Sequence, residues 1–229
     1  MAAWRYSSAR GGFQRQGVSR ENDMAKTFKF TRERQAFAQL KHEVENNPGL
    51  REDIEQTLQQ LLGRFATSIR ENRFIVGGVL EVILVTALRA AGVQAQDVGM
   101  TEQRIDIKIP QGGFSVKGHF SSAGDIRLIN VLGASSETAW ETATIFVLHK
   151  VGIGYADPEL IGREHIRRAT DAIVLRYTAL RNFLEQHPQY LIQCAVPSSM
   201  QDTASSELVS RVVAKEILKD TKILVNYIP

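Results

Sequence analysis

The sequence predicts an α/β (α+β) domain whose central β-sheet is flanked by helices, and three stretches of the chain support this prediction. Residues 104–117 alternate between apolar and polar side chains on both sides of a Pro-Gln-Gly-Gly break, as a β-hairpin does. Residues 74–91 are apolar almost all round a helix, which is typical of a helix packed inside a domain. Residues 31–68 carry apolar side chains at three- and four-residue spacing, which indicates amphipathic helices.

The first 30 residues form a basic arm rich in Gly, Ser and Gln. It contains six Lys and Arg against two acidic residues, a balance of +4, whereas the whole chain of 229 residues carries only +3. Such an arm can neutralise DNA phosphates. A tail without fixed structure, or sequence upstream of a true start at Met24, explains the same composition, and both explanations stay open.

Two helices are expected next, over residues 31–46 and 50–68, separated by Asn47-Pro48-Gly49. We assign residues 31–72 to a helical subregion and residues 73–229 to the core of the domain. At 43% hydrophobic residues, the chain has enough apolar material to bury a large core.

The helix predicted over residues 74–91 carries a carboxylate at Glu81, between Leu80 and Val82. A carboxylate is rarely buried without a partner or a metal ion, so Glu81 is a candidate ligand. Neutralisation by an internal arginine such as Arg73 or Arg89 is the structural alternative. Gly77 and Gly78 leave space on this helix for a strand or for DNA backbone, and Gly92 is suited to close the helix.

The predicted hairpin places Ile105, Ile107 and Ile109 on one face of its first strand, after a short strand over residues 93–100. Treating residues 110–113 as the turn pairs Ile109 with Phe114. In that register Asp106 lies opposite Lys117, so a carboxylate and an ammonium group meet on the polar face.

The remaining elements are expected in the following order. Residues 125–132 form the next antiparallel strand, and a loop leads to a short helix that carries Glu137 and Glu141. Residues 143–155 fit a core strand, although residues 139–148 fit a helix equally well. Then follow a helical region over residues 158–186, rich in arginine, a strand over residues 190–196 that holds Cys194 as a buried thiol, a helix over residues 207–219, and a strand over residues 223–227.

The composition excludes several classes of protein. The longest apolar run, residues 75–91, is too short and too charged to span a membrane, and residues 1–17 lack the apolar centre of a secretory signal. The single cysteine excludes an intramolecular disulfide, and no zinc spacing or phosphate-binding loop occurs. A cytoplasmic enzyme fits these observations.

Asp106, followed after nine residues by Ser115-Val116-Lys117, resembles the core motif of the PD-(D/E)XK nucleases. In that family the Asp and a second acidic residue bind a divalent metal, and the Lys contacts the attacking water or the scissile phosphate. The sequence departs from the pattern at Ile105, where Pro is usual, and at Ser115, where the second carboxylate is usual. The resemblance, mainly within residues 74–132, implies a restriction-endonuclease-like core with a mixed central sheet.

The resemblance also implies the roles of the site residues. Asp106 and the carbonyl of Val116 bind Mg²⁺, for which Mn²⁺ can substitute, Lys117 orients or polarises water, and Ser115 occupies the position of the absent carboxylate. Glu81 is the first candidate for the missing ligand and Glu137 the second. His119 shares the face of Lys117 and is a further candidate for a phosphate contact, although a structural role is commoner for a lone histidine.

The function implied by the resemblance is that of a type II restriction endonuclease. It hydrolyses double-stranded DNA with Mg²⁺ at a specific, palindromic sequence, and a homodimer matches the two-fold symmetry of such a site. A repair or recombination nuclease, such as a junction resolvase, has the same core. A DNA-binding protein without catalytic activity is the third possibility.

Overall fold

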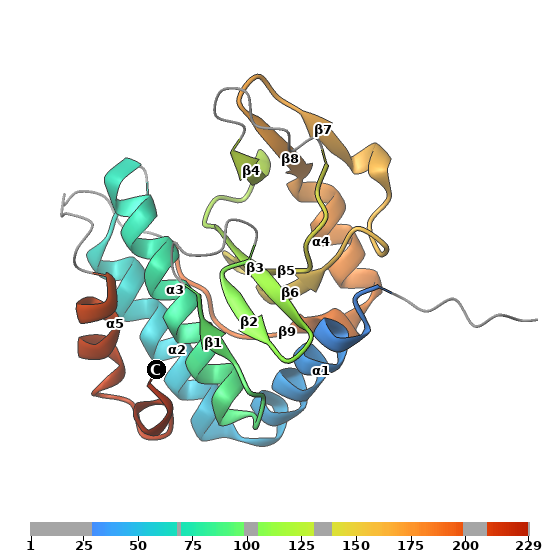
Figure 1. Cartoon of the computed structure of the whole chain (residues 1–229). Helices are drawn as coiled ribbons and strands as arrows, with labels where there is room; N and C mark the ends of the chain where they lie inside the picture. The colour runs from blue at the N-terminus through green and yellow to red at the C-terminus, as the bar shows by residue number, and fades with distance from the viewer. Residues whose placement is uncertain (1–28, 68–69, 99–104, 131–138, 199–209, 229) are drawn as a thin grey trace, which may run out of the picture.

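The computed structural model describes residues 29–67, 70–98, 105–130, 139–198 and 210–228, and a mixed six-stranded sheet runs through its centre (Figure 1). Only β3 and β5 pair in parallel, and every other neighbouring pair of this sheet is antiparallel. The predicted mixed sheet flanked by helices is therefore confirmed. In sheet order, its strands are β1 (Gln96–Asp97), β2 (Ile107–Ile109), β3 (Gly112–His119), β5 (Thr144–Leu148), β6 (Gly152–Ala156) and β9 (Leu191–Ile192).

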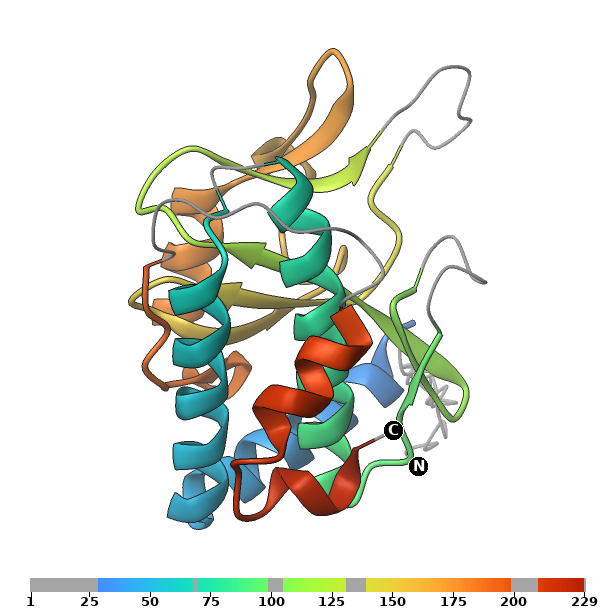
Figure 2. The same cartoon turned by 90° about the vertical axis from the view of Figure 1, so that its left-hand side faces the viewer.

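One face of this sheet is covered by helices (Figure 2). Ile145 and Val147 of β5 point to this side and join a core built largely from helical side chains. The elements that cover this face are α1 (Thr31–Asn46), α2 (Pro48–Arg64), α3 (Arg70–Ala90), α5 (Ser210–Leu218) and the short 3-10 helix η5 (Leu224–Tyr227). In Figure 2, α2, α3 and α5 stand side by side.

The opposite face carries α4 (Tyr177–Gln186) and a second, three-stranded sheet. Phe146 and Leu148 of β5 point to this side, where they pack in a second core with Leu175 and Leu180. The second sheet has the order β4 (Asp125–Asn130), β8 (Ala172–Arg176), β7 (Ile166–Arg168). Strand β4 thus lies between the parallel strands β3 and β5 in sequence but outside their sheet.

The burial of β5 explains why the pattern of residues 139–148 fits a helix as well as a strand. All five of its residues are buried, because helices cover one side of it and the second core covers the other. A strand buried on both faces loses the two-residue alternation that distinguishes it from a helix. The structure resolves the ambiguity in favour of a β5–β6 hairpin, whose connection includes Lys150 at φ +58°.

The first helices begin and end close to the predicted positions, with one reversal. Pro48 is the first residue of α2 and does not merely end α1. The backbone N–H at the first position of a helix has no partner within the helix, so proline, which lacks this N–H, fits there. Asn47 caps this helix by accepting a hydrogen bond from the Leu50 amide at 3.2 Å. As predicted, Gly92 (φ +80°) closes α3, and its amide bonds the carbonyl of Arg89.

The helical region predicted over residues 158–186 is largely wrong, because only α4 is an α-helix. The first part contains the 3-10 helix η2 (Arg163–His165), β7 and β8, since the buried run over residues 172–175 pairs with both β4 and β7. The strand predicted over residues 125–132 forms as β4, but it belongs to the second sheet. Residues 224–227, predicted as part of a strand, form η5. Between β9 and α4 lies η3 (Pro188–Tyr190).

Candidate functional site

The β2–β3 hairpin differs from its predicted register by two residues. Its turn consists of Pro110 and Gln111, which has φ +64°, and Ile109 pairs with Gly112 instead of Phe114. A proline followed by a residue of positive φ is the pattern of a type II turn. Gly112 and Gly113 are consequently strand residues and not part of the turn.

The two glycines permit close packing against a buried carboxylate of α1 and against the backbone of β2. The Gly113 amide donates a hydrogen bond to Glu33 Oε1 at 3.2 Å, and Glu33 is only 7% exposed. A Cβ atom on Gly112 would lie 2.3 Å from the same oxygen, and one on Gly113 would lie 2.7 Å from the carbonyl oxygen of Ile107. These glycines therefore permit the close approach of α1 and β2 to β3, which the sequence alone did not reveal.

The corrected register keeps Asp106 on the polar face but changes its neighbours. Asp106 donates its amide to the carbonyl of Phe114 at 2.8 Å, which places it beside Ser115. Asp106 Oδ2 accepts hydrogen bonds from Ser115 Oγ at 3.0 Å and from the Val116 amide at 2.6 Å. Lys117 Nζ lies 3.8 Å from the same oxygen, diagonally across the hairpin.

This arrangement divides the two oxygens of Asp106 between different tasks. Oδ2 is held by the donors of β3, whereas no residue that the structure describes donates a hydrogen bond to Oδ1. In an extended strand the N–H and C=O of one residue point to the same edge, so the carbonyl of Val116 points to the edge where its amide meets Asp106. Asp106 Oδ1 and the carbonyl oxygen of Val116 are thereby directed to the start of β2, where β3 extends beyond the residues that pair with β2.

Glu81 of α3 lies within electrostatic reach of this hairpin. Burial raises the pKa of Glu81 to about 8, and the negative charge of Asp106 acts in the same direction. The ammonium group of Lys117 lowers the pKa and so opposes both effects. Helix α3 packs against β3, and the charges of Glu81, Asp106 and Lys117 influence one another. We call this group of residues the Asp106 site.

The alternative partners of Glu81 are directed elsewhere. Arg89 Nε donates to the carbonyl of Ala95 at 2.7 Å, and Arg73 Nε donates to the carbonyl of Thr67 at 2.9 Å. Neither guanidinium group contributes to the pKa shift of Glu81. The space predicted for a strand beside Gly77 is open, since a Cβ atom there would meet nothing within 4 Å.

Asp97 is the residue of this site that the sequence analysis missed. It pairs with Ile107 across β1 and β2, and its charge also raises the pKa of Glu81. A signal was present, because Asp97 is the acidic residue of the short strand predicted immediately before the hairpin. No pattern in the sequence indicates that this strand lies next to α3.

The donors of the Asp106 site fit a hard divalent cation. Within the described ranges, no three His, Cys, Asp or Glu side chains form a group that could hold a metal ion by themselves. Mg²⁺ needs no such group, because it retains water ligands and commonly uses one or two carboxylates together with substrate phosphates. Asp106, Glu81 and the carbonyl of Val116 supply oxygen donors of that type. Binding of Mg²⁺ at this site is a prediction.

The remaining candidates are Glu137, Glu141 and His119. Glu137 is outside the described residues, and Glu141 is exposed in a stretch, residues 139–143, that is not the predicted helix. The ring of His119 lies 4.8 Å from that of Tyr177, and its Nε2 lies 3.0 Å from Ser121 Oγ. Burial lowers the pKa of His119, which favours the neutral ring.

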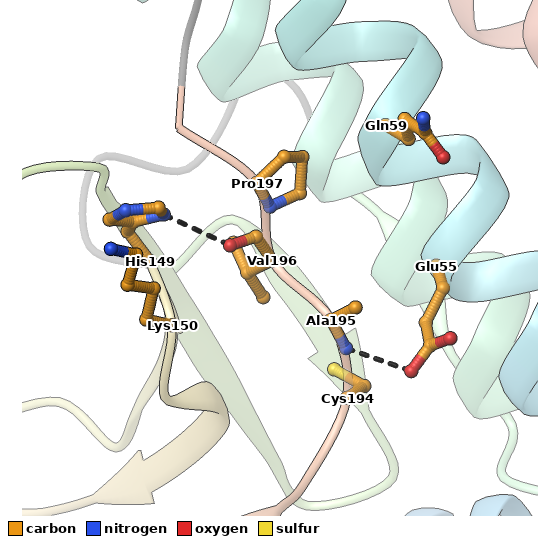
Figure 3. Close-up of a pocket in the computed structure, with 8 residues that line it drawn as sticks. All are labelled: Glu55, Gln59, His149, Lys150, Cys194, Ala195, Val196 and Pro197. Carbon is orange, nitrogen blue, oxygen red and sulfur yellow. Dashed lines mark hydrogen bonds between the residues drawn. The ribbon is translucent and has the colours of Figure 1, made fainter.

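A pocket of about 600 Å³ lies away from the Asp106 site (Figure 3). Its wall is held by two hydrogen bonds, from the Ala195 amide to Glu55 Oε1 at 2.8 Å and between His149 Nδ1 and the carbonyl of Val196 at 3.0 Å. Burial raises the pKa of Cys194 in this wall to about 12, so its thiol is protonated, in line with the predicted structural role. None of the residues at the Asp106 site lines this pocket.

Comparisons with known proteins complete the description. No family model matches the sequence, and no curated protein matches it. Among solved structures, the chain is similar to a restriction endonuclease in complex with substrate DNA, at 14% identity and a TM-score of 0.45, over 75% of this chain and 91% of that chain. In the part of the chain that the structure describes, no helix has the length and apolar character needed to cross a membrane.

Proposed function

We propose that this protein is a metal-dependent endonuclease that hydrolyses double-stranded DNA at a specific, palindromic sequence, as type II restriction enzymes do. The observation that carries the proposal is the grouping of Asp106, Lys117 and Glu81 at the edge where β2 and β3 diverge. This grouping matches the chemistry of the PD-(D/E)XK pattern, with the second carboxylate supplied by a helix instead of the strand. The chain would then act as a homodimer on its site.

Each residue of the site has a distinct task in the proposed reaction. Mg²⁺, when bound, supplies a Lewis acid for the phosphate and lowers the pKa of water. Asp106 is oriented by the hydroxyl of Ser115 and the amide of Val116, which leaves its second oxygen available to hold the metal. Lys117, whose Nζ lies 3.8 Å from Asp106 Oδ2, would donate a hydrogen bond to the attacking water or to a phosphate oxygen.

Ser115 and Glu81 together account for the departure from the usual motif. A hydroxyl on β3 positions Asp106 but is a weaker ligand for a hard cation than a carboxylate. Glu81 would add the missing carboxylate from α3, and its pKa, raised first by burial and then by the charge of Asp106, is that of a carboxyl group that keeps its proton at neutral pH in the absence of a cation. Metal binding would displace the proton from Glu81.

A plasmid digest tests the proposal directly. Supercoiled plasmid DNA is incubated with the purified protein in Mg²⁺ and, in parallel, in EDTA, and the products are separated on a gel. Discrete fragments in Mg²⁺ alone support sequence-specific cleavage. Cleavage of four-way junctions without cleavage of plasmid would instead indicate a junction resolvase, and binding without cleavage of any substrate would contradict nuclease function.

A further inference from the structure

The second sheet presents a row of arginines on the face that α4 does not cover. Arg127 of β4 and Arg167 of β7 both pair with Val174 of the central strand β8, so all three share one face of the sheet. Arg176, two residues beyond Val174, lies on the same face. The other face packs into the second core through Ile126 and other apolar side chains. Figure 1 shows α4 beside β8. We call the outer row, Arg127, Arg167 and Arg176, the arginine face.

The arginine face is exposed at the surface of the second sheet. The side chains of Arg127 and Arg167 are 54% and 60% exposed, yet Val174 between them is only 4% exposed. Arginine stems that cover a neighbouring apolar residue leave the guanidinium groups at the surface. Asp171 binds Arg127 at 2.9 Å and Asp125 binds Arg167, which keeps both groups in place.

The second sheet and the strand that carries Lys117 are neighbours. His119 lies on the same face of β3 as Lys117, and its ring lies 4.8 Å from that of Tyr177, the residue after Arg176. Tyr177 packs in the second core, on the side of the second sheet opposite the arginine face.

We propose that the arginine face binds the phosphate backbone of the DNA duplex. The planar guanidinium group binds phosphate through two parallel hydrogen bonds, and an exposed carboxylate partner can be exchanged for such a phosphate. The inference rests on the proposed function, because the bound DNA is the duplex that the Asp106 site is proposed to cleave. It adds a binding surface for DNA that the motif itself does not contain.

The test compares the binding of a labelled duplex in EDTA, where cleavage does not occur, at several salt concentrations. The triple variant Arg127→Gln, Arg167→Gln, Arg176→Gln should bind about 10-fold or more weakly at low salt. Its slope of log affinity against log salt should be shallower by about 2 to 3, since each lost phosphate contact removes about 0.9. Arg181→Gln is the matched control, because Arg181 is also 54% exposed and paired with a carboxylate, Glu185, but lies on α4.

A second variant keeps the test valid if the triple variant folds poorly. Asp125→Asn with Asp171→Asn releases the arginines and removes two negative charges, so it should bind the duplex more tightly than the wild type. Impaired folding cannot produce such a gain. If both variants show unchanged affinity and slope while the wild type cleaves plasmid DNA, the inference is wrong but the nuclease function stands. A wild-type protein that neither binds nor cleaves duplex DNA would overturn both.

Discussion

The carboxylate of Asp106 is held by three consecutive residues of the neighbouring strand, so its function depends on atoms that the motif does not include. The amide of Val116 is a backbone donor and cannot be removed by substitution. The hydroxyl of Ser115 and the ammonium group of Lys117 can be removed. Variants of Ser115 and Lys117 can thus separate the effect of orienting Asp106 from the effect of removing a group proposed to take part in the chemistry.

Asp106→Ala and Lys117→Ala should each abolish DNA cleavage while leaving the fold and DNA binding largely intact. Each change removes a metal or water contact from a half-exposed strand surface, and Asp106→Ala also removes a negative charge that repels phosphate. Cleavage of plasmid DNA and anisotropy of a labelled duplex measure the two effects. Lys108→Ala, an exposed lysine of the same hairpin, is the control. Cleavage at the wild-type rate by Asp106→Ala would contradict the assigned site.

Ser115→Ala should slow cleavage by about 10-fold without abolishing it. The change removes one hydrogen bond that orients Asp106, whereas the Val116 amide still holds the same oxygen. Single-turnover cleavage rates measure the loss. A loss as large as that of Asp106→Ala would mean that Ser115 takes part in the chemistry itself.

Glu81 makes the stability of the metal-free protein depend on pH. The pKa of this carboxyl is raised from 4.5 to about 8 by burial and by Asp106, so between these values the unfolded chain loses its proton first. The stability of the fold therefore falls as pH rises from about 4.5 to about 8. Glu81→Gln removes this dependence, and at pH 8 in EDTA its Tm should exceed that of the wild type.

Thermal unfolding at pH 5 and pH 8, with and without Mg²⁺, tests this prediction without any activity assay. Mg²⁺ should raise the Tm of the wild type more at pH 8, where Glu81 releases its proton more readily, and should affect Glu81→Gln much less. Glu141→Gln, which changes an exposed carboxylate outside the site, should behave as the wild type does. A Tm response to Mg²⁺ that is identical in wild type and Glu81→Gln would remove Glu81 from the metal site.

At the scale of the elements, the hairpin shows what a sequence pattern determines and what it leaves undetermined. Alternation predicts which face each residue occupies, and Asp106, Ser115 and Lys117 do share one face. A shift of two residues preserves every face, so alternation cannot distinguish the predicted register from the observed one. The distinction depends on Glu33, which is 80 residues away from Gly113 in the chain.

Gly113→Ala should destabilise the fold by about 1 to 3 kcal/mol, because its Cβ atom would meet the backbone oxygen of Ile107. Gly77→Ala is the contrasting variant. It adds a methyl group to open space in the interior of α3 and should stabilise the helix by about 0.5 to 1 kcal/mol. Urea unfolding measures both changes. An undiminished stability of Gly113→Ala would contradict the close approach of β2 and β3.

Tertiary packing also decides other elements of the chain. The helical region predicted over residues 158–186 includes the run 172–175, whereas the burial of this run between two strands is a tertiary property. At the site, the spacing from Asp106 to Lys117 is local and could be predicted. The approach of Asp97 to Glu81 depends on how α3 packs against β1, and no local pattern records that packing.

At the scale of the whole molecule, the proposed function requires two copies of the chain. A palindromic site presents the same sequence to each copy, so a two-fold dimer places one Asp106 site on each DNA strand. Analytical ultracentrifugation at micromolar concentration should therefore give about twice the chain mass of 25.6 kDa. A monomer both alone and on DNA would contradict the palindromic mode of recognition.

The placement of β4 outside the central sheet has a consequence for the order in which a newly made chain matures. The hairpin that holds Asp106 closes within a dozen residues, whereas Arg127 must wait for Asp171, 44 residues later, before the second sheet can assemble. At a synthesis rate of about 5 to 20 residues per second, this interval is roughly 2 to 9 s. During that time a nascent chain carries the hairpin that holds Asp106 but not its arginine face, so the proposed DNA-binding surface forms after the proposed catalytic hairpin.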